Sequence, residues 1–122
     1  MSLKNIAVES WTYSFGSGSG NVTVTNQPSN KVKFDGKKAF FDKIEFSISN
    51  YIGGGINQGS ASGSISGSAT KLTIEGKAAV LEGDESLPIT IYGTSTVYPY
   101  NPDTATDTVK VLKAGQSKAK AE

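Results

Sequence analysis

The chain is constrained most by an eleven-residue pattern that occurs twice, with the copies forty residues apart. Residues 31–41 read KVKFDGKKAFF, and residues 71–81 read KLTIEGKAAVL. The copies share Lys, Gly, Lys and Ala at matched positions, and the apolar and acidic positions keep their type. Each copy predicts a β-hairpin, because alternating apolar residues flank an acid–Gly pair that suits a tight turn. The predicted turn residues are Asp35, Gly36, Glu75 and Gly76.

A third apolar alternation follows each hairpin, over residues 44–48 and 87–91. The repeat is therefore longer than eleven residues, and we place its two units at residues 31–51 and 71–92. Pro88 has no N–H for a strand ladder, so we expect it at a strand start, an edge or a bulge. A repeated hairpin is typical of a scaffold built from a duplicated unit rather than of a catalytic pocket.

Alternation with a period of two runs through nearly every ordered-looking segment, and no segment has a helical period, so we expect an all-β fold. The 122 residues include 14 Gly, which favours one turn-rich domain of short hairpins, spanning residues 1–112. Residues 113–122 are Lys-, Ala- and Ser-rich without a large apolar side chain, and they are predicted to form a disordered tail.

The chain contains neither His nor Cys. Ser–His–Asp catalysis, Cys–His catalysis and the usual zinc sites are therefore excluded. The acids fall mostly in turns or beside Lys, where carboxylates are ordinarily solvated, so we expect no enzyme, no cofactor and no metal. Residues 101–107 are rich in oxygen ligands for calcium, but they lack the spacing of an EF-hand loop, and a turn beside Pro102 explains them better.

The net charge of +1 gives no broad electrostatic argument for nucleic acid as a partner. The densest group of lysines, in residues 31–43, lies beside acids and indicates a solvated face. No apolar run approaches the roughly 20 residues that a membrane-spanning helix needs. We therefore expect neither nucleic-acid binding nor a membrane-spanning segment.

Trp11, Tyr13 and Phe15 alternate with polar residues, which places all three rings on one face of a strand. This face could pack on the core, or it could form an aromatic platform for a sugar or a protein partner. The core interpretation is favoured, because large aromatic side chains are mostly buried.

Ser occupies every second position of residues 60–68. The run could be a flexible linker, or a strand whose other face of Gly, Ala and Ile is thin enough for close approach by another segment. The strict alternation favours the strand.

The two hairpins resemble the PAAR-repeat family, small proteins that cap the spikes of contractile injection machines. Family members combine an alternating apolar run, an acid–Gly or Asn–Gly turn, a Lys/Pro/Ala stretch and a Gly–Asp ending. Residues 72–84 match best and end in Gly83 and Asp84, whereas residues 32–42 lack this ending, although Asp42 occupies a similar place. The resemblance covers about half of the chain. Typical members hold zinc near the tip with His and Cys, so that site is not carried over to this chain.

The resemblance implies a compact, cone-like or wedge-like domain that acts as a non-enzymatic spike tip. Its partner would be the blunt end of a trimeric β-helical spike, with one tip per trimer, in a type VI secretion apparatus, a phage tail or an extracellular injection particle. Such a tip could carry an effector, and it would assemble in the cytoplasm and then be exposed or delivered outside the cell. Repeats that approximate three-fold symmetry would fit this partner, with the third unit at residues 22–24 or 109–112. The candidates for core or interface are Phe34, Phe41, Ile74 and Leu81.

The sequence is compatible with two other functions. The first is a secreted β-sandwich module that binds carbohydrate or another ligand on the face of Trp11, Tyr13 and Phe15. The second is a self-assembling fibre or tail subunit, which would form a symmetric oligomer.

Overall fold

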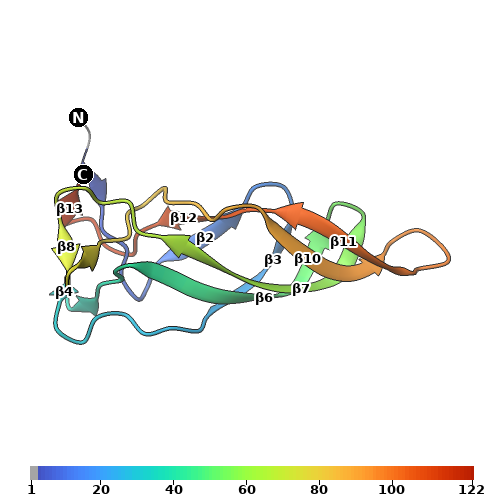
Figure 1. Cartoon of the computed structure of the whole chain (residues 1–122), viewed down its shortest axis with the longest axis horizontal. Coiled ribbons are helices and arrows are strands. Elements are labelled where there is room, and N and C mark those ends of the chain that lie inside the picture. Colours follow the sequence, from blue (N-terminus) through green and yellow to red (C-terminus); the bar gives the residue numbers. More distant parts are fainter. Residues whose placement is uncertain (1–2) are drawn as a thin grey trace.

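The computed structural model describes residues 3–122, which form thirteen β-strands and no helix, so the predicted all-β class is confirmed. The molecule is elongated, with β4, β8 and β13 at one end and the loop after β10 at the other (Figure 1). The strands are β1 (Lys4–Asn5), β2 (Thr12–Phe15), β3 (Ser19–Val24), β4 (Lys33–Phe34), β5 (Lys37–Lys38), β6 (Lys43–Gly53), β7 (Ile56–Ser66), β8 (Thr73–Ile74), β9 (Lys77–Ala78), β10 (Ile89–Ser95), β11 (Pro102–Asp107), β12 (Val109–Lys113) and β13 (Lys120–Ala121).

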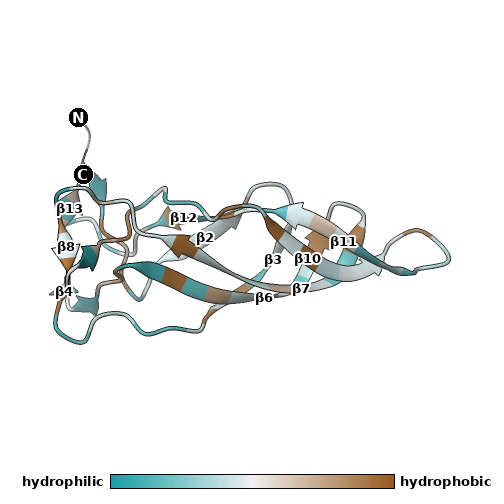
Figure 2. Ribbon diagram, in the orientation of Figure 1, coloured by the Kyte–Doolittle hydropathy of each residue, from teal (hydrophilic) through white to brown (hydrophobic). Residues whose placement is uncertain are grey.

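The body of the molecule is a five-stranded antiparallel sheet in the order β11–β10–β7–β6–β3. A second antiparallel ribbon, β2 with β12, contributes side chains to the same core. Apolar and polar residues alternate along β6 (Figure 2), as expected for a strand with one face on the core. The largest buried side chains of this body core are Tyr51, Phe40 and Phe46, together with the isoleucines at positions 44, 48, 56, 65 and 91.

The serine-rich run forms the strand β7, as its alternation predicted. Its Gly, Ala and Ile face lies on the body core. A Cβ added at Gly63 would lie 2.6 Å from Cδ1 of Ile89, and one added at Gly59 would lie 2.9 Å from Cγ2 of Ile91. The two glycines therefore leave the space that these isoleucines of β10 fill.

Both repeated hairpins are present, β4 with β5 and β8 with β9. The turn residues have positive φ: 54° at Asp35, 76° at Gly36, 52° at Glu75 and 81° at Gly76. Positive φ at both central residues is the geometry of a type I′ turn, whose twist matches that of the strands.

The third alternation of each repeat is also a strand, β6 after the first hairpin and β10 after the second. Pro88 directly precedes β10, at the strand start. Leu87 differs from the expected alternation, because its side chain is 84% exposed, whereas Ile89 and Ile91 are buried.

Residues 113–122 differ from the expected disordered tail. β13 pairs with β1 at the other end of the chain, and Ala121 is buried. The amide nitrogen of Gln116 donates to the main-chain oxygens of Ile6 and Ala119, while its amide oxygen accepts two main-chain N–H groups. Composition indicated disorder because alanines bury little apolar area, but these hydrogen bonds and the pairing with β1 order the segment.

Ala121→Asp should destabilise the protein, because it places a carboxylate among apolar side chains without a partner. We expect the free energy of unfolding to fall by roughly 2–4 kcal/mol in urea denaturation. The neighbouring exposed residue supplies the control, and Lys120→Asp should cost less than about 1 kcal/mol. Similar losses in the two variants would contradict the packing of this segment.

Candidate functional site

Three short two-stranded units, two of them hairpins, occupy equivalent positions at one end of the molecule. Two are the sequence repeats, and the third takes its first strand from β13 and its second from β1. Residues 118–122 read KAKAE, which follows the pattern of KVKFD and KLTIE in the other copies. The matched cross-strand pairs are Lys33 with Lys38, Thr73 with Ala78, and Lys120 with Asn5.

The third unit therefore differs from both expected locations. Residues 22–24 belong to β3 and residues 109–112 to β12, and both strands lie in the body. The signal was present in the sequence, but the third copy is split, with its first half near the C-terminal end and its second half near the N-terminal end.

Each hairpin continues into a three-residue segment, and the three segments close a ring. The segments are residues 6–8, 39–41 and 79–81, and each pairs through its first residue with one neighbour and through its last residue with the other. The bridges are Ile6 with Leu81, Val8 with Ala39, and Phe41 with Ala79.

Main-chain hydrogen bonds between the central residues of these segments complete the cycle. The N–H of Ala7 donates to the oxygen of Val80 (2.8 Å), and the N–H of Val80 donates to the oxygen of Phe40 (3.3 Å). The N–H of Phe40 donates in turn to the oxygen of Ala7 (3.0 Å). The three units are thus related by a pseudo-three-fold axis within one chain, and we call this assembly the hairpin ring.

The hairpin ring has its own apolar cluster, separate from the body core. The predicted core candidates Ile74 and Leu81 are buried in it, and Phe34 and Phe41 are partly buried against it. Matched positions of the three units supply nearly all of the cluster. By unit, its members are Val32, Phe34, Ala39 and Phe41; Leu72, Ile74, Ala79 and Leu81; and Ala119, Ala121, Ile6 and Val8.

The acid that follows the first strand of each unit is contacted in the same sense around the hairpin ring. Nζ of Lys118 lies 3.3 Å from Oδ1 of Asp35, and Nζ of Lys71 lies 3.1 Å from Oε2 of Glu122. The hydroxyl of Ser29 donates to Oε2 of Glu75 at 2.7 Å, which completes the set. Each contact joins the start of one unit to the acid after the first strand of another, so the predicted turn acids Asp35 and Glu75, together with Glu122, link the units. The lysines are exposed, and such pairs add little stability.

Charge is distributed unevenly over the molecule. Nine of the twelve lysines lie in the hairpin segments 4–5, 31–38, 71–78 and 118–122, which hold only three of the eleven acids. The rest of the chain has three lysines and eight acids. The net charge of +1 therefore conceals a basic hairpin ring and an acidic body.

Gly83 and Asp84 have a structural role beside the hairpin ring. Gly83 has a φ of 94°, in the region that favours glycine. Asp84 is buried, and its carboxylate accepts hydrogen bonds from the hydroxyl of Ser68 (2.5 Å) and the N–H of Leu81 (2.8 Å). Gly83 and Asp84 therefore hold the chain in place where it leaves the second unit.

The aromatic side chains of β2, and of Trp11 directly before it, lie against the body core. Trp11, Tyr13 and Phe15 are half-buried and pack edge to face, with ring centroids 6.1 Å and 6.0 Å apart. Phe15 makes the next such contact, at 5.3 Å from Tyr51. The row is therefore continuous with the core, as the favoured interpretation of this face predicted.

The sequence did not single out the most strongly perturbed titratable pair, Tyr51 with Asp107. The hydroxyl of Tyr51 donates to Oδ2 of Asp107 at 2.5 Å, and the main-chain N–H groups of Ser17, Gly18 and Thr108 donate to the same carboxylate. Residues 101–107 belong mainly to β11 rather than to a calcium loop or a turn.

Burial acts against the charge of Asp107, but the hydrogen bonds outweigh it and lower the pKa of this carboxyl below 3.8. Burial, the hydrogen bond to Asp107 and the negative charge of Asp107 raise the pKa of Tyr51 to about 12. The pair fastens the turn after β2 to β6 and β11, and it lies away from the hairpin ring.

Among residues 3–122, no group of three or more acids could hold a metal ion. The same residues include no helix of the length and apolarity that would cross a membrane. Comparisons with models of protein families, with curated proteins and with solved structures gave no match to this chain.

Tyr51→Phe should lower stability at neutral pH and change its dependence on alkali. The pKa of Tyr51 rises from 10 in the unfolded chain to about 12 in the folded protein. Tyr51 therefore contributes fully to stability below pH 10, and this contribution is lost as the pH rises towards 12. We expect a loss of about 1–3 kcal/mol at pH 7 and a shallower decline in stability between pH 10 and 12, measured by urea unfolding. Asp107, with a lowered pKa, contributes above its unfolded pKa and loses this contribution as pH falls through the folded value.

The exposed Tyr92 provides the matched control, because Tyr92→Phe removes a hydroxyl that has no hydrogen-bond partner among the described residues. This variant should retain the alkaline decline of the natural protein. An unchanged alkaline profile in Tyr51→Phe would contradict the assignment.

Proposed function

We propose that this chain is a non-enzymatic, PAAR-like spike-tip protein that caps a trimeric β-helical spike of a contractile injection machine. The observation that carries the proposal is the hairpin ring, in which one chain presents three equivalent units about a pseudo-three-fold axis. Because a trimer presents three copies of each surface element, one such ring can make related contacts with all three subunits. The expected stoichiometry is one tip per trimer.

The surface chemistry of the hairpin ring supports a protein partner. Val32, Phe34, Phe41 and Leu72 are only partly buried, so part of the apolar cluster remains at the surface. The surrounding lysines would form a charged rim, as at other protein interfaces. The excess of lysine favours a partner whose matching end is acidic, because complementary charge speeds and orients association.

The shape of the molecule supports an orientation for the tip. The hairpin ring lies at one end of the long axis, and the loop between β10 and β11 lies at the other, narrower end (Figure 1). In our proposal, the hairpin ring binds the end of the spike, and the loop between β10 and β11 forms the outer point of the tip. The protein assembles in the cytoplasm and leaves with the particle, which could be a type VI apparatus, a phage tail or an extracellular injection particle.

The first test is the isolation of the partner. Tagged protein recovered from native lysate should bring down one trimeric protein, and native mass spectrometry should give three partner subunits per tip. Recovery of a monomer or a homo-oligomer alone, with no trimeric protein bound, would contradict the proposal.

Reversing the charge of one lysine in each unit of the hairpin ring should weaken this complex. The exposed residues Lys4, Lys33 and Lys77 make no ion pair with another described residue, so the triple change to Glu should spare the fold. We expect at least about a tenfold higher Kd in surface plasmon resonance, with a weaker dependence on salt.

The three lysines outside the hairpin segments provide a control with the same change in net charge. Lys43, Lys110 and Lys113 lie outside the hairpin segments. Their triple change to Glu should raise the Kd clearly less than the change within the hairpin segments, because complementary charge acts mainly where the partners meet. Equal weakening by the two triple variants would place the interface elsewhere.

A further inference from the structure

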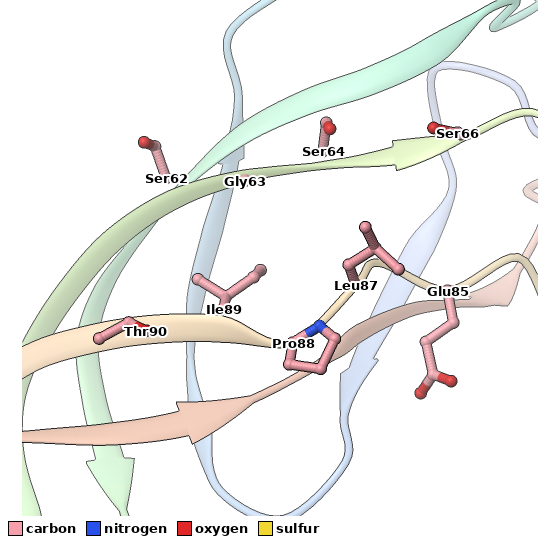
Figure 3. Close-up of a pocket in the computed structure, with 9 residues that line it drawn as sticks. All are labelled: Ser62, Gly63, Ser64, Ser66, Glu85, Leu87, Pro88, Ile89 and Thr90. Carbon is pink, nitrogen blue, oxygen red and sulfur yellow. The ribbon is translucent and has the colours of Figure 1, made fainter.

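The five-stranded sheet is split between two of its central strands. β7 pairs with β6 as far as Ser66, but β10 pairs with β7 only over residues 56–60. Beyond Ser60 the two strands separate, and a cleft of about 530 Å³ lies between residues 62–66 and residues 85–90 (Figure 3). Ligand pockets commonly measure roughly 300–1,000 Å³.

The wall formed by β7 offers unpaired main-chain groups to this cleft. The N–H and C=O of Glu45 on β6 bond with Asn26 and Thr25, on the side of β3, so Glu45 does not bond its partner Ser64. The main-chain groups of Ser64 must therefore point away from β6, into the cleft. The C=O of Lys43 likewise accepts a hydrogen bond from the side chain of Asn26. Ser66, which lies opposite Lys43 on β7, therefore also points its main-chain groups into the cleft.

In an antiparallel strand, every second residue points its main-chain groups to the same side, so those of Ser62 also point into the cleft. None of the main-chain groups of Ser62, Ser64 and Ser66 has a partner among the described residues. Three N–H and three C=O groups thus follow one another along the free edge of β7, with the spacing that a neighbouring strand requires.

The opposite wall does not close this gap. Pro88 has no N–H to donate, and β10, which pairs with β11 along its other edge, pairs with β7 only from Tyr92 onward. Leu87, 84% exposed, lies on this wall beside Ile89, and Glu85 is the only charged residue of the lining (Figure 3). The cleft therefore combines an unpaired strand edge with a mainly apolar opposite wall.

We propose that this cleft binds one extended peptide segment of a partner protein, about five residues long, as an added strand on the edge of β7. Strand addition supplies the main-chain donors and acceptors that Ser62, Ser64 and Ser66 lack, which neither a sugar nor a helix could match along the whole edge. The bound segment alternates, with aliphatic side chains towards Ile89 and polar ones beside Ser64. The site lies in the body, so it is separate from the hairpin ring and does not depend on the proposed spike.

Amide hydrogen exchange of the free protein tests the open edge directly. The N–H groups of Gly63 and Ile65 face β6 and should exchange slowly, whereas those of Ser62, Ser64 and Ser66 should exchange at least about a hundredfold faster. Equal protection of the two sets would overturn the proposal, because the cleft would then be closed by the chain itself.

A capped Val-Thr-Val-Thr-Val peptide is the probe for binding. At millimolar concentration it should slow exchange at Ser62, Ser64 and Ser66 and shift their amide resonances, while a version N-methylated at alternate residues should not. Absence of any change, or equal changes with the methylated peptide, would overturn the proposal. Light scattering during the titration should show one protein chain, and a dimer would assign the edge to a second copy instead.

Ser64→Pro is the matched variant, because it removes an N–H that bonds nothing in the fold and should leave the ladder with β6 intact. It should weaken the peptide at least about tenfold, whereas Ser64→Ala, which keeps the N–H, should bind within about twofold. Circular dichroism confirms folding of both variants. Equal binding by the two folded variants would show that the peptide does not use this edge.

Discussion

The cycle of hydrogen bonds between Ala7, Phe40 and Val80 is the interaction on which the hairpin ring depends. Each of these main-chain units donates to one neighbour and accepts from the other, so none can be satisfied alone. The three residues are buried, and their side chains belong to the body core, whereas the residues beside them supply the apolar cluster of the ring. The cycle thus joins the two cores of the molecule at one layer.

Local patterns in the sequence were sufficient for much of the fold. The acid–Gly pairs located both repeated turns, because only a few residues accept positive φ at two successive positions. The serine alternation located β7, and Trp11, Tyr13 and Phe15 were placed correctly on one core-facing strand side. These features depend on neighbours within a few residues, where periodicity and turn chemistry carry the information.

Features that depend on distant residues were not accessible in this way. Residues 118–122 looked disordered, because their order comes from pairing with β1 and from the four hydrogen bonds of Gln116. Asp107 looked like part of a turn, since nothing near it in the sequence indicates Tyr51 as its partner. The open edge of β7 is likewise set by where β10 departs, which no pattern within β7 records.

The split third hairpin has a consequence for how the protein is made. Residues 4–8 leave the ribosome more than a hundred residues before residues 118–122, and neither can complete its unit without the other. The ring must therefore close late and over a long loop, which makes folding slow. A chain that lacks residues 118–122 would lack one of the three units, so the hairpin ring can be complete only after these residues have been synthesised.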